Sequence, residues 1–117
     1  MISMYLPVTV TFRYTDILRG LVALFQAWNS DKTVMFTGPT AVQQRNFHNL
    51  LDDYESEKPM YATAQIVVDL LTLYRPNTIQ EAYKLLLENH IVEQAELDTL
   101  QEWCRLVESF SRYKNDT

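Results

Sequence analysis

The chain has 117 residues, of which 47% are hydrophobic and 12% aromatic, and its formal net charge at pH 7 is −5. This length fits one domain, and the hydrophobic content excludes wholesale disorder. The acidic balance argues against a general nucleic-acid binder, which needs clustered lysine and arginine to displace counterions. No apolar run approaches the roughly 20 residues that span a bilayer, so we expect a soluble chain without a membrane segment.

The N-terminal part of the sequence predicts two short strands around a buried helix. Residues 8–12 alternate and are rich in β-branched side chains, which is typical of a strand whose apolar residues face the core: Val8, Val10 and Phe12. Residues 17–28 are apolar over more than one stripe, so this helix should be the most buried of the domain. Gly20 inside it indicates a close backbone approach. Residues 33–37 read as a second strand, which Gly38-Pro39 ends.

The C-terminal part predicts an irregular loop followed by three helices. Residues 40–58 have no clear period, and a loop of this length in a compact domain is usually functional. Helical spacing starts at residue 56, with Pro59 in the first turn, and stops at Arg75-Pro76. The second helix opens with a capping box, either Asn77 with Gln80 or Thr78 with Glu81. Its inward residues should be Ile79, Ala82, Tyr83 and Leu86. The last helix covers about residues 93–112 and should bury Leu97, Leu100, Cys104 and Val107.

We therefore predict one α+β domain over residues 1–117 that is mostly helical. A strand, helix and loop part at residues 7–55 carries the candidate site, and a helical part follows at residues 56–112. Two strands alone are marginally stable. We expect the chain to be a piece of a larger domain or to pair with another chain.

The charged residues that are best suited to chemistry lie at the junction between the first predicted strand and the first predicted helix. Arg13, Asp16 and Arg19 fall within this junction. Asp16 follows Thr15, a good N-cap, so its carboxylate should lie in the first helical turn, where the helix dipole favours negative charge. The segment is either a site presented by a charged turn or a capping acid with solvated or ion-paired arginines.

Two other features invite a metal or acid–base interpretation. His48 lies in a polar loop and could act as a ligand or acid–base group, although a lone exposed histidine is more often neither. The acidic run at residues 51–55 could attract a hard cation, but acids before a helix are usually solvated and favoured by the dipole. The single cysteine, Cys104, sits among apolar helix positions and reads as a buried, inert thiol.

Four segments together resemble the STELLO-like glycosyltransferases. Residues 10–20 resemble the family segment (S/T)-x-R-x-x-D-I-x-R-G-Y, and residues 38–46 resemble P-T-V-x-(Q/H)-R-(N/Y). Residues 52–57 fall where the family has an acidic stretch before its helices, and residues 89–97 resemble G-F-W-x-(E/D)-x-(D/E)-L. The resemblance covers about residues 7–110, and its specific part is the Arg–Asp–Arg-Gly segment.

The resemblance implies sugar transfer from a nucleotide-sugar donor by a GT-A-like domain, anchored in the Golgi in eukaryotic members. This chain would be the C-terminal, acceptor-side part, with the nucleotide-binding half and its D-x-D motif upstream. Asp16 would be the general base that deprotonates the acceptor hydroxyl. Guanidinium groups would bind the diphosphate or the acceptor, and the implied substrate-binding set is Arg13, Arg19, Gln44 and Arg45.

The resemblance also sets expectations for metals and partners. A divalent metal such as Mn²⁺ is expected in a complete enzyme and not in this chain alone. His48 is a weak candidate ligand, because Gln43-Gln44 stand where some family members carry histidine. Partners would be a nucleotide sugar, an unknown acceptor, and the missing half or another protein chain. The alternative is a non-catalytic binding or assembly module derived from such an enzyme.

Overall fold

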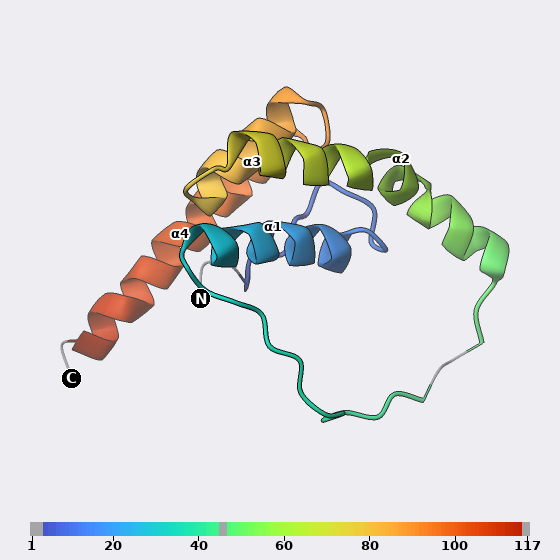
Figure 1. The fold of residues 1–117 in the computed structure, drawn as a ribbon, viewed down its shortest axis with the longest axis horizontal. Coiled ribbons are helices and arrows are strands. Elements are labelled where there is room, and N and C mark those ends of the chain that lie inside the picture. Colours follow the sequence, from blue (N-terminus) through green and yellow to red (C-terminus); the bar gives the residue numbers. More distant parts are fainter. Residues whose placement is uncertain (1–3, 45–46, 116–117) are drawn as a thin grey trace.

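The structure is a computed structural model that describes residues 4–44 and 47–115, and within these ranges it is built from helices alone. The helices are α1 (Thr15–Asn29), α2 (Leu50–Tyr74), α3 (Ile79–Glu88) and α4 (Gln94–Asn115). In Figure 1 the described residues of the connection from α1 to α2 lie away from the helices as an open loop. Helix α1 packs on α2 and α3, and α3 packs on α4.

The predicted α+β class is wrong, because the described part of the chain contains no strand. At residues 8–12 the reason is local. The Val8 and Thr9 N–H groups both donate to the carboxylate of Glu96, at 2.9 and 3.1 Å. Successive residues of a strand point to opposite sides, so two neighbouring N–H groups cannot share one acceptor there. Val8 and Phe12 are accordingly 56% and 91% exposed, and Val10 alone of the predicted strand packs against the core.

The second predicted strand, residues 33–37, is also wrong. These residues belong to the open connection, where they are exposed and pair with no strand in the described ranges. A β-type sequence needs a neighbouring strand to pair its backbone groups. Without one, Met35 and Phe36 stay 81% and 93% exposed.

Helix α2 starts six residues before the predicted position, inside the segment expected to be a loop. The side chain of Asn49 caps it by accepting the N–H of Leu51 at 3.0 Å. Asp52 and Asp53 lie in the first turn, where their charge complements the helix dipole. Pro59 therefore lies inside the helix and not in its first turn as predicted.

Helix α1 lies where residues 17–28 predicted it, but it is not the most buried helix. It buries Leu18 and Val22, whereas α3 buries four residues, all predicted to face inward: Ile79, Ala82, Tyr83 and Leu86. Gly20 is exposed, and a Cβ there would meet nothing within 4 Å, so no other described element approaches its backbone closely.

The core is closed by the N-terminal segment, which Glu96 anchors to the start of α4. Glu96 is fully buried and accepts hydrogen bonds from the Tyr5 hydroxyl, both N–H groups of Val8 and Thr9, and the Thr9 hydroxyl. We call these contacts the Glu96 anchor. Burial, together with the hydrogen bond to Glu96 and its charge, raises the pKa of Tyr5, so its hydroxyl remains a donor. The Tyr5 ring packs edge-on against Tyr83, with centroids 5.4 Å apart.

The cap of α3 is formed by the second of the two predicted capping boxes. The Thr78 hydroxyl accepts the N–H of Glu81 at 3.2 Å, and the Glu81 carboxylate accepts the N–H of Asn77 at 2.9 Å. Thr78→Ala should lower the free energy of unfolding by about 1 kcal/mol, because one N–H at the helix start loses its acceptor. Chemical denaturation measures the change.

Thr99→Ala is the matched control, since Thr99 lies inside α4 and its hydroxyl donates to the Ala95 carbonyl. There the alanine should cost little, because it has the better helix propensity. Equal losses in the two variants would contradict the assigned cap.

Candidate functional site

A groove runs between the N-terminal segment and the first half of α2, and we call it the N-terminal groove. Its volume is about 490 Å³, within the range of small-ligand pockets. Its lining combines apolar, aromatic and charged side chains: Leu6, Phe12, Arg13, Thr15, Asp16, Ile17, Glu57, Met60 and Tyr61.

Hydrogen bonds fix the wall that carries Arg13 and Asp16. The Thr11 hydroxyl donates to the Ser56 carbonyl of α2 at 2.7 Å, and the Tyr14 N–H donates back to the Thr11 carbonyl at 2.9 Å. Tyr14, at the N-cap position of α1, is 1% exposed, and its hydroxyl accepts from Thr63 at 2.9 Å. Burial raises the pKa of Tyr14, against the opposing effect of that hydrogen bond. The turn before α1 is therefore held at both ends against α2.

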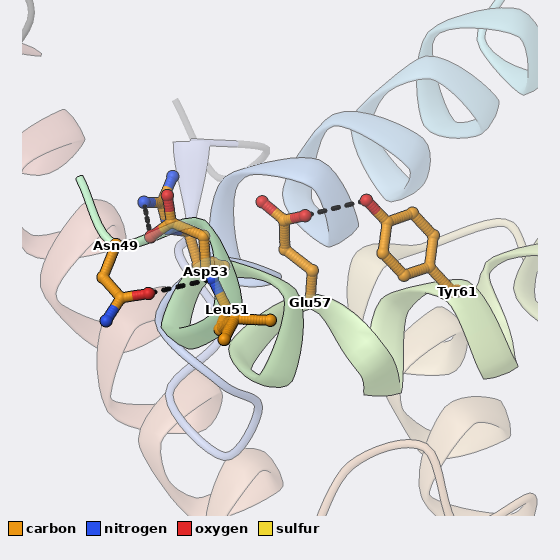
Figure 2. Close-up of polar contacts among 6 residues, drawn as sticks. Asn49, Leu51, Asp53, Glu57 and Tyr61 are labelled. Atoms are coloured by element: carbon orange, nitrogen blue, oxygen red, sulfur yellow. Dashed lines mark hydrogen bonds and ion pairs between the residues drawn. The ribbon is translucent and has the colours of Figure 1, made fainter.

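The opposite wall is one face of α2. Asp53, Glu57 and Tyr61 are spaced four residues apart, so they lie one above another along the helix, as Figure 2 shows. Asp53 forms an ion pair with Arg13, in which the two side chains are 24% and 33% exposed. Glu57 accepts the Tyr61 hydroxyl at 2.7 Å, and this hydrogen bond raises the pKa of Tyr61.

Asp16 lies in the first turn of α1, as predicted, and lines the groove beside Arg13. Its side chain is exposed, and Oδ1 accepts the N–H of Ile17 at 3.0 Å. The predicted N-cap, Thr15, lies inside the helix instead and donates to the Thr11 carbonyl at 3.3 Å. Asp16 is thus both a residue that serves the helix start and a carboxylate open to the groove.

The other predicted site residues lie apart from this groove. Arg19 does not line it, and its charge acts on Tyr83, whose pKa burial raises and Arg19 lowers. Gln44 and His48 are exposed in the connection before α2. Arg45 lies outside the described residues. The structure therefore brings together Arg13 and Asp16 from the predicted set.

Sequence reasoning missed the α2 wall and the Glu96 anchor. The acidic run was expected to be solvated or to attract a cation, whereas the spacing of Asp53, Glu57 and Tyr61 marks one face of a helix that starts at Leu50. Glu96 precedes the predicted core residue Leu100 by four positions, so it falls on the apolar stripe of α4. This position of a charged residue on an apolar stripe was the signal that could have indicated a buried carboxylate.

The Arg13–Asp53 pair should couple measurably, because both groups are partly shielded from solvent. A double-mutant cycle with Arg13→Ala and Asp53→Ala should give a coupling free energy of about 1 kcal/mol, falling at high salt. The coupling free energy is measured by denaturant unfolding of the wild type, the two single variants and the double variant. The exposed pair Arg105–Glu102 is the control and should couple less. Equal coupling in the two pairs would contradict a structural role for Arg13–Asp53.

Comparison with protein-family models, with curated proteins and with solved structures found no match to this chain. In the two ranges that the structure describes, no helix combines the length and apolar character needed to cross a membrane. Within the same ranges, no group of three or more His, Cys, Asp or Glu side chains is arranged to hold a metal ion.

Proposed function

We propose that this chain is the acceptor-side, C-terminal part of a glycosyltransferase, with Asp16 as its general base. The observation that carries the proposal is the Arg13–Asp53 ion pair. It joins residues 10–20 to residues 52–57, two segments that resemble the STELLO-like family separately and lie 40 positions apart at the paired residues. A groove of ligand size opens beside the pair.

The chemistry assigned to Asp16 follows from its surroundings. Oδ1 accepts the Ile17 N–H, while Oδ2 accepts no hydrogen bond from the described residues and is open to an acceptor hydroxyl. A general base must reach the proton it removes directly or through one water. Asp16 meets that requirement for a ligand lying in the groove.

The arginine roles differ from those that the resemblance implied. Arg13 spends part of its guanidinium on Asp53, so we assign it to fixing the groove wall and orienting the acceptor. Arg19 is outside the groove, which leaves the donor diphosphate and a divalent metal such as Mn²⁺ to the nucleotide-binding half.

A second candidate is a non-catalytic binding or assembly module. It is favoured by the apolar side chains of the connection and the start of α2, which are 75% or more exposed: Met35, Phe36, Val42, Phe47, Leu50 and Leu51. Such a segment fits contact with another polypeptide. Turnover separates the two candidates.

Asp16→Asn should lower the turnover number of the full-length protein at least about 100-fold, with the acceptor KM nearly unchanged, because the base is lost and the shape is kept. Release of nucleoside diphosphate from a panel of nucleotide sugars measures it. Asp52→Asn is the matched control: an exposed acid in the first turn of α2, outside the groove. Normal turnover in Asp16→Asn would overturn the base assignment. A full-length protein with no turnover at all would favour the binding module.

A further inference from the structure

The side chains that line the N-terminal groove offer more hydrogen-bond acceptors than free donors. The two hydroxyl donors are engaged inside the protein, because Tyr61 donates to Glu57 and Thr15 donates to the Thr11 carbonyl. Arg13 gives one N–H to Asp53, so its other N–H groups can still donate in the groove. Ionised carboxylates accept hydrogen bonds and cannot donate them, so Asp16 and Glu57 retain capacity for further donors. Hydroxyl groups match this groove, because they can donate to the two carboxylates and accept from Arg13.

The charge of the groove points the same way. Arg13 is matched by Asp53, which leaves the carboxylates of Asp16 and Glu57 without a cation among the lining residues. Lys58, the next residue after Glu57, is bound to Glu55 at 2.7 Å and does not line the groove. Asp16 already supplies negative charge to the start of α1. Because Asp53 already offsets the charge of Arg13, an anionic ligand would meet two like charges that no further lining cation compensates.

The apolar part of the lining is aromatic and open. Phe12 is 91% exposed and Tyr61 is 61% exposed, so each ring presents surface to the groove and to solvent. Figure 2 places the Tyr61 ring beside the Glu57 carboxylate on the same face of α2. Rings next to carboxylates suit a ligand that carries C–H faces and hydroxyl groups together.

We propose that the N-terminal groove binds a neutral, hydroxyl-rich sugar and discriminates against sugars that carry a carboxylate. This inference rests on the proposed function and specifies its acceptor: a neutral glycan whose hydroxyls donate to Asp16 and Glu57 while its C–H faces cover Phe12 and Tyr61. Selection comes from repulsion of the wrong ligand as much as from contacts to the right one.

The test compares methyl glucoside with methyl glucuronide, which differ in a hydroxymethyl group against a carboxylate. Amide NMR titrations of this chain should show shifts at Phe12, Asp16 and Tyr61 for the glucoside. The glucuronide should bind at least about tenfold more weakly. In the double variant Asp16→Asn, Glu57→Gln, the ratio of the two dissociation constants should fall towards one. Phe12→Ala should weaken both sugars without unfolding the chain, because this ring is almost fully exposed.

Three outcomes would overturn the inference: no response of the groove to the glucoside, equal or tighter binding of the glucuronide, or an unchanged ratio in the double variant. Binding selectivity and turnover are separate readouts. A selective groove in a protein whose Asp16→Asn variant turns over normally would keep the sugar specificity and reject the base. A non-selective groove with turnover lost in Asp16→Asn would do the reverse.

Discussion

One buried carboxylate organises the N-terminal third of this fold. Glu96 is fully shielded from water and can be tolerated there because hydrogen-bond donors surround it. All of them come from residues 5–9, roughly ninety positions away in sequence. The Glu93 N–H, in turn, donates to the Thr9 hydroxyl at 3.0 Å, so the loop before α4 and the N-terminal segment hold each other.

The candidate site depends on this anchor. With residues 5–9 fixed, the chain passes directly to the turn at Thr11, whose hydroxyl bonds α2 at Ser56. The Arg13–Asp53 pair and the Tyr14–Thr63 hydrogen bond continue the contact, and the groove opens between the two walls. Polar contacts between residues far apart in the sequence therefore give the groove its shape. A few side chains beside these contacts give it its chemistry.

The difference between local features and contacts of residues far apart in the sequence explains what could be predicted from the sequence. Helical periodicity is local, so the inward face of α3 and the place of Asp16 in the first turn of α1 were predicted correctly. The Thr78 cap was one of two predicted alternatives, and the predicted cap of α1 was wrong, because Tyr14 and not Thr15 is at that position. The strand predicted at residues 8–12 was wrong. Its apolar residues do alternate, but the N–H groups of Val8 and Thr9 donate to the carboxylate of Glu96 in α4 and not to a neighbouring strand. Tertiary contacts override β propensity in this way.

The same reasoning applies to the site. Arg13 and Asp16 are neighbours in sequence and share the groove, so proximity along the chain sufficed to group them. Arg19 lies one turn further along the same helix and does not line the groove, whereas Asp53 reaches Arg13 from another helix. The positions of Arg19 and Asp53 relative to the groove depend on how α2 packs against the turn before α1, which the sequence pattern does not indicate.

The most direct test of this account is hydrogen exchange at the Val8 and Thr9 amides in the wild type and in Glu96→Gln. If the anchor holds the segment, protection at both amides should fall at least about 100-fold in the variant, while the α3 amides keep theirs. Glu93→Gln, an exposed change of equal charge nearby, should leave both amides protected. Unchanged protection of Val8 and Thr9 in Glu96→Gln would contradict the account, because the segment would then be held by other contacts.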